Sequence, residues 1–465
     1  MKRRDFFSNS SLALLGTSLL SPIDLLAKNS FPLKGKSAKN IIFLVSDGMS
    51  TGTLNMASLL LQRKEGRQSN WIKLYEENKG KRALMDTSSS NALVTDSAAG
   101  SSAWGGGVKV PNGSLNVNAD GSFNKPILQK FKDAGKSVGC VTTVTITHAT
   151  PAGFCVNNKS RGDEYEIAGQ YLDLKFDVMM GGGRQFFSKN KRKDQVDLLE
   201  KYRKAGFAVV QNRDEMLGLD ISLKKPILGL YAEGGLPYSL DAAQDTKIQK
   251  DVPTLAEMTQ KTISLLSQNS KGFVMQVEGG KVDWAAHAND AAGLLYDQIA
   301  FDDAVKVALD FAEKDKETLV IMTTDHGNGN PGLFGNDKNF DRIQKFKQTN
   351  DWILNGIDNK FTTTQVIERI EAAQGYAIKT AEAETLLSSY TKMDGDGLYN
   401  PYKLPFKQLG AIQSNYISVN WASMDHSGDF VELAMFGPGS ELLKPFVKNT
   451  DLHNLMLQVT GVDHV

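Results

Sequence analysis

Four of the six histidines lie in short polar motifs that also contain other metal-binding side chains. The motifs are ITHATPA, EGGKVDWAAH, TTDHGNGN and SMDHSGD, which contain His148, His287, His326 and His426. Three of these histidines have an aspartate beside them or four residues away, and Asp47 stands in a further motif, FLVSDGMS. Histidine and aspartate side chains are common ligands of divalent metals. The motifs together predict a site that holds more than one metal ion.

The spacing of Asp283 and His287 suits one shared metal ion. Residues four apart lie on the same face of a helical turn, so both side chains can bind the same ion. His426, from far along the chain, would complete a set of three ligands with one open position. Three protein ligands and an open position are typical of catalytic zinc sites.

The remaining motifs predict a second and a third metal position. Asp325 and His326 are adjacent, and Asp47 could join them at one ion while bridging to another. Oxygen ligands from Asp47, Thr150 and Glu278 would suit magnesium. An isolated Asp-His pair is usually a surface feature, but here several pairs follow apolar runs and have glycine neighbours.

Ser97, in VTDSAAG, is the candidate nucleophile. The small residues after it permit a helix start, where backbone N–H groups and the helix dipole favour an anion. A nearby divalent metal lowers the pKa of a hydroxyl, so Ser97 could attack phosphorus. Arg161 could hold two phosphate oxygens through its planar guanidinium group. Taken singly, Ser97 could be only a helix cap and Arg161 only a surface arginine.

Four continuous apolar runs lead into these motifs, at residues 41–45, 138–144, 273–277 and 319–323. Continuous runs are typical of strands that are covered on both faces, as in a parallel sheet between helices. Helical spacing is found at residues 126–134, 195–205, 254–268 and 294–313. The sequence therefore predicts an α/β fold with a central, mostly parallel sheet and helices on both faces. In such sheets the ligand site lies beyond the carboxyl ends of the strands.

Residues 28–465 are expected to form one catalytic domain. Residues 110–124 are turn-rich and predict a surface loop or hairpin. Residues 337–410 are polar, lysine-rich and helical, and we interpret them as an insertion that covers part of the site. Within it, residues 394–397 (DGDG) lack a full calcium loop and predict a plain turn.

Residues 1–27 predict a signal peptide. Lys2, Arg3 and Arg4 precede an apolar stretch at residues 12–20 that is too short to span a bilayer. The paired arginines favour a twin-arginine export signal, with an ordinary secretory signal as the alternative. The protein is therefore expected to be periplasmic or secreted.

The composition gives no sign of a nucleic-acid or membrane partner, because the net charge is 0 and no other apolar run could span a bilayer. An apolar content of 41% is enough for a large core. Cys140 and Cys155 have no metal-motif spacing. Cys140 is expected to be a buried thiol, and a bridge between the two cysteines stays open.

Taken together, the motifs resemble the alkaline phosphatase family from about Lys39 to Gly439. They are NIIFLVSDGMS, VTDSAAG, THATPAG with the later SR, FDVMMGGGRQFF, QVEGGKVDWAAH, TTDHGNGN and MDHSGDFVELAMFGPG. The resemblance implies hydrolysis of small-molecule phosphate monoesters through a phosphoserine. The roles it implies are nucleophile for Ser97, phosphate binding for Arg161, one Zn²⁺ for Asp283, His287 and His426, a second Zn²⁺ for Asp47, Asp325 and His326, and Mg²⁺ for Asp47, Thr150 and Glu278.

The chain departs from one type of family member at two positions. His148 and Trp284 stand where that type has aspartate and lysine. His148 is therefore expected to lie near the third metal and to shift its preference toward another divalent ion. Trp284 removes a positive charge near the phosphate, and Asp96 is expected to support the site without binding a metal. Family members are often dimers, so a homodimer is also expected.

Three rival functions are weighed on the same residues. Sulfatases need a C/S-x-P-x-R motif, which neither Cys140 nor Cys155 has. Phosphodiesterases of the same superfamily generally lack a Glu278-type third site and the arginine at 161. A non-catalytic periplasmic protein that binds metal or phosphate would be expected to lose Ser97 or Arg161, and both are present.

Overall fold

The computed structural model describes residues 37–335, 337–390 and 404–462, and a ten-stranded sheet runs through them. Strand β13 is antiparallel to β2 and β8, and the other neighbouring pairs are parallel. The strands are, in order across the sheet, β14 (Phe446–Lys448), β2 (Lys81–Asp86), β13 (Val431–Phe436), β8 (Thr318–Thr323), β1 (Asn40–Val45), β7 (Phe273–Glu278), β3 (Ser137–Thr145), β4 (Val178–Gly182), β6 (Ile227–Leu230) and β5 (Ala208–Val210).

Two small antiparallel pairs stand apart from this sheet. They are β10 (Gly332–Leu333) with β11 (Val419–Asn420), and β9 (Gly327–Asn328) with β12 (His426–Ser427). The second pair brings the TTDHGNGN and MDHSGD motifs side by side, although they are far apart in the sequence.

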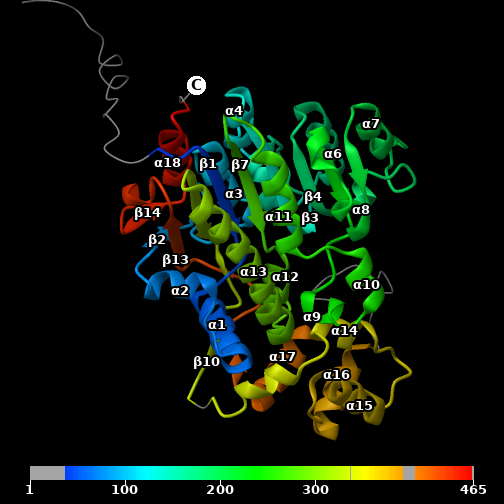
Figure 1. The fold of residues 1–465 in the computed structure, drawn as a ribbon. Helices are drawn as coiled ribbons and strands as arrows, with labels where there is room; N and C mark the ends of the chain where they lie inside the picture. Colours follow the sequence, from blue (N-terminus) through cyan, green and yellow to red (C-terminus); the bar gives the residue numbers. More distant parts are fainter. Residues whose placement is uncertain (1–36, 336, 391–403, 463–465) are drawn as a thin grey trace, which may run out of the picture. The chain divides into compact units, whose positions relative to one another are not determined.

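Helices cover both faces of the sheet, as predicted (Figure 1). Alternate residues of β1 enter two separate cores: Ile42 and Leu44 pack with α1 and α13, while Ile41 and Phe43 pack with α3, α4 and α5. The helices are α1 (Thr51–Glu65), α2 (Asn70–Glu76), α3 (Ser97–Gly106), α4 (Ile127–Asp133), α5 (Ala149–Cys155), α6 (Glu164–Leu174), α7 (Leu198–Lys204), α8 (Arg213–Leu217), α9 (Ser239–Ala242), α10 (Thr246–Asp251), α11 (Leu255–Leu266), α12 (Lys281–His287), α13 (Ala291–Asp315), α14 (Asn350–Asn355), α15 (Thr363–Gln374), α16 (Thr380–Tyr390), α17 (Phe406–Ile417) and α18 (Asp451–Thr460), with short 3-10 turns at Arg184–Phe186, Ile221–Leu223, Phe340–Lys345 and Ser440–Leu442.

The central strands end at the same level, which brings their following residues together. Val45, at the end of β1, pairs with Glu278 of β7 on one side and Thr323 of β8 on the other. Asp47 follows β1 and Asp325 follows β8, so both carboxylates start from the same edge of the sheet as Glu278. Figure 1 shows α1 and α12 beyond this edge.

The four predicted central strands are confirmed as β1, β3, β7 and β8. The helix predicted at residues 195–205 is shorter and begins at Leu198. Gln195 has a left-handed backbone, with φ 55°, and Asp197 caps the helix by accepting a hydrogen bond from the backbone of Glu200. A left-handed residue cannot lie inside a right-handed helix, which explains the later start.

Both cysteines are free and buried, so the open question of a bridge is resolved in favour of thiols. The Sγ atoms of Cys140 and Cys155 lie 3.6 Å apart. Within residues 110–124, a β-bridge between Val117 and Phe123 forms the predicted hairpin-like turn.

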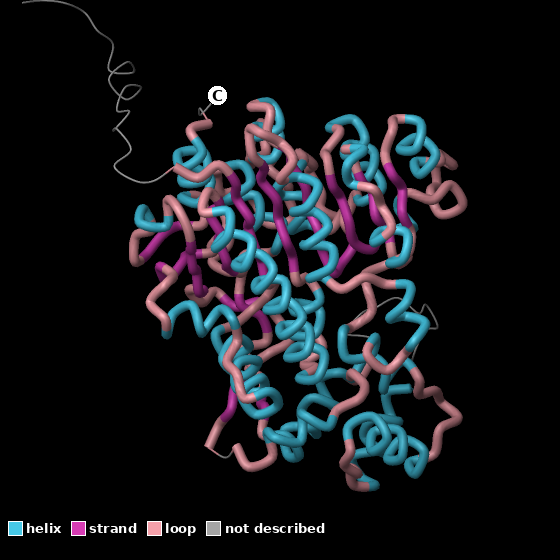
Figure 2. The backbone as a smooth tube through the Cα atoms, in the orientation of Figure 1, coloured by secondary structure: helices cyan, strands magenta, loops and turns pink. Residues whose placement is uncertain are grey.

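The described parts of residues 337–410 are helices joined by loops, as Figure 2 shows. Gly410, the predicted end of the insertion, lies inside α17. The turn expected at residues 394–397 and the signal peptide expected at residues 1–27 lie outside the described residues. In the described ranges, every helix is too short or too polar to cross a lipid bilayer.

Candidate active site

Ser97 is the first residue of α3, and Asp96 is its N-cap. One carboxylate oxygen of Asp96 accepts a hydrogen bond from the backbone of Ala99 at 3.0 Å. Ser97 is buried, and its Oγ lies 3.2 Å from Nε2 of His326. The serine hydroxyl therefore lies both at a helix N-terminus and beside a candidate metal ligand. Asp96 already caps the helix, so the alternative that Ser97 is only a helix cap is excluded.

The first group of candidate ligands consists of Asp47, Asp325 and His326, all fully buried. The Nε2 atom of His326 lies 3.2 Å from Oδ2 of Asp325 and 3.6 Å from Oδ1 of Asp47. The backbone of Gly48 donates a 3.1 Å hydrogen bond to Oδ1 of Asp325, which leaves Oδ2 of Asp325 directed to the group. Both Oδ1 of Asp47 and Oδ2 of Asp325 lack a hydrogen-bond partner among the described residues.

The second group joins Asp283, His287 and His426. The Nε2 atoms of the two histidines lie 3.0 Å apart, and they lie 3.5 and 3.6 Å from the two oxygens of Asp283. Backbone carbonyls orient both rings: Nδ1 of His287 is 2.6 Å from the oxygen of Met424, and Nδ1 of His426 is 2.9 Å from that of Thr95. Such carbonyl contacts fix the tautomer that leaves Nε2 free to bind a metal.

The two groups are joined at His326, which stacks on His426 with ring centroids 3.6 Å apart. Ligand atoms of Asp283, His326 and His426 also fall within 4.8 Å of one another. Two ions in these groups would therefore be close neighbours, as two-metal chemistry requires.

The third group contains Asp47, Glu278 and His148, whose ligand atoms lie within 4.8 Å of one another. Thr150 belongs to the same place, because its hydroxyl donates a 3.0 Å hydrogen bond to Oδ2 of Asp47. Nδ1 of His148 lies 3.9 Å from Oε1 of Glu278, and neither atom has a hydrogen-bond partner in the described part of the chain. From the sequence we expected His148 to lie near the third metal without binding it. The geometry allows His148 to be a direct metal ligand.

Arg161 lies half-buried at the edge of these groups. One guanidinium nitrogen donates to Oδ2 of Asp96 at 3.2 Å, and another lies 3.1 Å from Nε2 of His148. The ring of Trp284 meets that of His148 edge-on, with centroids 6.3 Å apart. Asp96 thus holds both the helix that begins at Ser97 and the arginine. The guanidinium group is oriented by the protein before any anion binds.

The ionisation of the buried ligands reflects their crowding. Burial, followed by repulsion from Asp325 and Asp283, raises the pKa of Asp47 well above its usual value. Burial also opposes ionisation of Asp325, but the attraction of His326 outweighs it and lowers the pKa of that carboxyl. Burial and repulsion from His326 lower the pKa of His426 to about 4. His426 is therefore neutral near pH 7, the form that binds metals.

Two supporting residues were missed by the sequence reasoning. The side-chain amide of Asn328 donates a 2.7 Å hydrogen bond to Oδ1 of Asp283. The hydroxyl of Thr142 donates to Oε2 of Glu278. Both residues lie inside quoted motifs or runs, but neither type is a preferred metal ligand. The pairing of β3 with β7 places Thr142 beside Glu278, and the packing of β9 against α12 places Asn328 beside Asp283.

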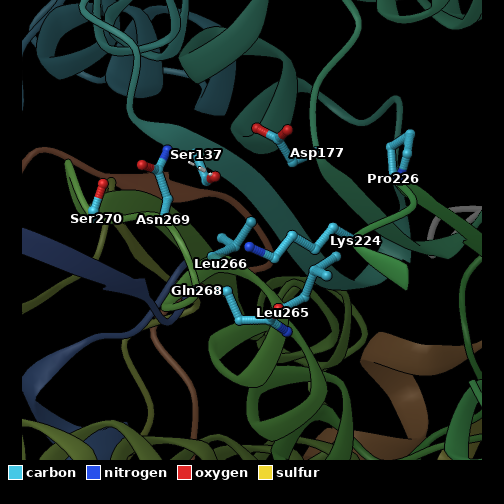
Figure 3. Close-up of a pocket in the computed structure, with 9 residues that line it drawn as sticks. All are labelled: Ser137, Asp177, Lys224, Pro226, Leu265, Leu266, Gln268, Asn269 and Ser270. Carbon is cyan, nitrogen blue, oxygen red and sulfur yellow. Dashed lines mark hydrogen bonds between the residues drawn. The ribbon is translucent and has the colours of Figure 1, made fainter. Parts of the chain in front are cut away.

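A hollow at the amino ends of the strands is a poor alternative site (Figure 3). Its one carboxylate, Asp177, is already satisfied by Lys132, whose ammonium lies 2.9 Å from both oxygens, and by the backbone of Val138 at 2.8 Å. Lys224 extends over the hollow from an exposed turn. The reactive groups lie at the other edge of the sheet.

The chain is similar to several known proteins. A family model described as alkaline phosphatase matches residues 38–462. Alkaline phosphatase 4 of Bacillus subtilis is 33% identical over 432 residues, covering 90% of this chain and 88% of the relative. The crystal structure of Thermus thermophilus alkaline phosphatase has a TM-score of 0.85 at 30% identity, covering 92% of this chain and 93% of the other. A histidine-to-aspartate variant of TAB5 alkaline phosphatase, solved with magnesium bound, has a TM-score of 0.68 at 26% identity, covering 93% of this chain and 100% of the other.

Proposed function

The chain belongs to the alkaline phosphatase family, and we propose that it hydrolyses phosphate monoesters through a phosphoserine formed on Ser97. Membership of the family makes it a metal-binding phosphatase that acts on small-molecule monoesters. The observation that carries the proposed mechanism is the position of Ser97. Its Oγ lies 3.2 Å from His326, at the start of α3 and within the candidate metal ligands.

Two Zn²⁺ ions and one Mg²⁺ ion are the proposed cofactors. The buried oxygens of Asp47, Glu278 and Asp325 that lack hydrogen-bond partners fit cations, because unpaired buried carboxylates are strongly disfavoured. Asp283, His287 and His426 would hold one zinc, Asp47, Asp325 and His326 the other, and Asp47, Thr150 and Glu278 the magnesium. When bound, the ions would neutralise phosphoryl oxygens and lower the pKa of the serine hydroxyl.

The chain's own residues divide the reaction into two displacements. Oγ of Ser97 attacks phosphorus in line, its proton is released, and the alcohol leaves. Arg161 holds two non-bridging oxygens with its planar guanidinium group, and the first backbone N–H groups of α3 face the same anion. Water then attacks the phosphoserine, which returns Ser97 and releases inorganic phosphate. Asp96 keeps Arg161 and the start of α3 in fixed relation through both steps.

His148 is proposed to alter the metal preference of the third position. An imidazole near Asp47 and Glu278 is a better ligand for zinc or another transition metal than for magnesium. The magnesium-bound TAB5 variant, in which a histidine is replaced by aspartate, supports the same idea for a relative. The replacement His148→Asp should therefore increase the magnesium bound per chain and the stimulation of activity by added magnesium. Unchanged magnesium binding would contradict this role.

Activity measurements separate this function from its rivals. We expect hydrolysis of a chromogenic phosphate monoester at alkaline pH, loss of activity with a chelator, and recovery when zinc and magnesium are both returned. The matching diester and sulfate ester should react much more slowly. Faster hydrolysis of the diester would favour a phosphodiesterase. Metal and phosphate binding without turnover of any ester would favour a non-catalytic binding protein.

Export to the periplasm or medium and assembly into a homodimer are part of the proposal. The basic and apolar pattern of residues 1–27 supports export. Amino-terminal sequencing of the protein recovered from the periplasm or medium would locate the cleavage point. Sedimentation equilibrium of the mature protein would show whether it is a dimer, and a single monomeric species would contradict that part.

A further inference from the structure

A pocket of about 500 Å³ lies among the loop that follows β6, helices α9 and α11, and helix α13. Its walls are mostly apolar and include Leu236, Pro237, Val252, Leu255 and Ala300. The volume falls within the range of pockets that bind small molecules, roughly 300–1,000 Å³. The proposed phosphatase mechanism uses none of these residues.

Asp297 is the buried charged group in this wall, with an exposed fraction of 5%. Its Oδ2 accepts hydrogen bonds from the backbone and the hydroxyl of Ser239, both at 3.1 Å. Both of these hydrogen bonds go to the same oxygen, Oδ2. The other charged groups of the lining, Arg213 and Glu257, satisfy each other through contacts of 3.0 Å. A ligand in the pocket would therefore meet Asp297 as the one carboxylate of the lining that is not paired with an arginine.

The surroundings of Asp297 carry more negative than positive charge. Lys281 is the buried cation there, and it interacts electrostatically with Asp241, Asp290, Asp297 and Asp351. Its ammonium lies against aromatic rings, 3.6 Å from the centroid of Tyr238. One ammonium thus faces four carboxyl groups.

The pKa of Asp297 is set first by its burial. Burial raises it to about 7, and the single ammonium of Lys281 only partly offsets that effect. An added cation beside Asp297 would supply the missing positive charge and would favour the ionised carboxylate.

We propose that this pocket binds a small organic cation whose ammonium group contacts Asp297 and whose apolar body packs against Leu236 and Leu255. A hydrated metal ion fits less well, because the apolar walls offer few oxygen ligands. An alkyl- or arylalkylammonium ion matches both the single carboxylate and the apolar lining. The inference does not depend on the phosphatase mechanism.

The pocket shares residues with the start of the metal-ligand helix α12. The backbone carbonyl of Thr143, which lines the pocket, accepts a 2.8 Å hydrogen bond from Leu236. The hydroxyl of Thr143 accepts a 3.0 Å hydrogen bond from the backbone of Lys281, the first residue of α12. Because of this link to α12, turnover is not an independent measure of ligand binding in the pocket. Binding is therefore measured directly.

The test is calorimetric titration of the full, metal-loaded protein with 2-phenylethylamine and with the neutral 2-phenylethanol. The buffer contains no amine, and inorganic phosphate saturates the metal site so that the amine does not bind there. We expect one saturable site for the amine. The alcohol should bind about tenfold or more weakly, because it lacks the charge-assisted hydrogen bond.

Three variants locate the site. Asp297→Asn should weaken amine binding about tenfold or more while leaving alcohol binding unchanged, and Ala300→Leu should weaken both by filling the space. Asp310→Asn is the matched control, since Asp310 is an exposed residue of the same helix paired with Lys306 at 2.7 Å. Thermal unfolding of each variant checks its fold. If Asp297→Asn does not fold, Ala300→Leu alone decides. Absence of saturable amine binding, or binding unaffected by the folded pocket variants, would overturn the proposal.

Discussion

At the scale of residues, the site is defined by polar atoms that the protein buries without giving them partners. Oδ1 of Asp47, Oε1 of Glu278, Oδ2 of Asp325 and Nδ1 of His148 are buried and have no hydrogen-bond partner among the described residues. Leaving a buried polar group unpaired costs about 1–3 kcal/mol, and more when it is charged. A cluster of such atoms around one serine is costly for an apoprotein and suits a protein that binds metal ions.

Removing the hydroxyl of Ser97 should separate catalysis from metal binding. We expect Ser97→Ala to keep its metals, because the carboxylates and imidazoles of the three groups remain. Turnover should fall by about three orders of magnitude or more, as is typical when a nucleophile is removed. Ser101→Ala on the same helix is the control, since Ser101 bonds to backbone carbonyls and not to His326. Steady-state kinetics with elemental analysis would check this, and near-normal turnover of Ser97→Ala would rule Ser97 out.

Replacing Arg161 by alanine should weaken phosphate binding and leave the metals in place. A hydrogen bond to a charged group contributes about 1.5–3 kcal/mol, so the inhibition constant of inorganic phosphate should rise about 10- to 100-fold. Arg184→Ala is a matched control, because Arg184 is a half-buried arginine paired with Glu233 at 2.7 Å. An unchanged inhibition constant would remove Arg161 from the phosphate site.

The candidate metal ligands that the structure brings together could be selected from the sequence because histidine and aspartate have few other reasons to occur together after apolar runs. The residues that orient these groups by hydrogen bonds could not be predicted. Asn328 and Thr142 are polar residues of types that occur throughout the chain, and their partners Asp283 and Glu278 are distant in sequence. The pairing of β3 with β7 brings Thr142 to Glu278, and the packing of β9 against α12 brings Asn328 to Asp283. Neither contact is visible in the spacing of residues.

At the scale of elements, the site depends on tight turns at the strand ends. Gly48 follows β1 with φ +66°, a left-handed conformation that favours glycine. A Cβ atom at this position would lie 2.5 Å from Oδ1 of Asp283, so the turn and α12 approach each other too closely for any side chain. The glycine of the FLVSDGMS motif is thus a spacing element between two candidate metal groups.

Gly48→Ala should therefore damage the metal site and not only the backbone. A left-handed alanine costs about 1–2 kcal/mol by itself, and the clash should also displace Asp283. Gly66→Ala tests the backbone cost alone, since Gly66 has φ +70° with no atom within 4 Å of the added Cβ. We expect both variants to lose stability in chemical denaturation, but only Gly48→Ala to lose bound zinc and activity. Equal zinc content in the two variants would refute the spacing role.

The elements that carry the site were the ones most readily predicted. The runs that became β1, β3, β7 and β8 are long and apolar because helices cover both faces. The outer strands gave no comparable signal. β2 is exposed at half of its positions and β5 has only three residues, so neither has a distinctive apolar run.

At the scale of the whole molecule, acidic side chains connect α9 and the start of α13 to helix α14. Both oxygens of Asp241 accept hydrogen bonds from Thr349, at 2.8 and 2.6 Å. Asp290, the N-cap of α13, accepts a 2.7 Å hydrogen bond from the backbone of Asn350, the first residue of α14. α12 ends at His287, three residues before Asp290, so the contacts that fix α14 also fix the segment that follows a candidate metal ligand.

These buried acids should also make stability depend on pH, and Asp297 allows a test. Burial raises its pKa from 3.8 to about 7 in the folded protein. The folded state therefore holds a proton that the unfolded state loses above about pH 4. The protonated carboxyl contributes its full stability below pH 4, and this contribution is lost as the pH rises to about 7.

Asp297→Asn cannot titrate at this position and should not lose stability in this way. The free energy of unfolding of the wild type, minus that of the variant, should fall by about 1–3 kcal/mol between pH 4 and 7 and then level off. Taking the difference at each pH removes the common effect of metal loss in acid. Asp310→Asn, exposed on the same helix, should show no such trend. A difference that stays constant or rises with pH would mean that Lys281 compensates the charge of Asp297 fully, which would also remove the reason for a cation to enter the neighbouring pocket.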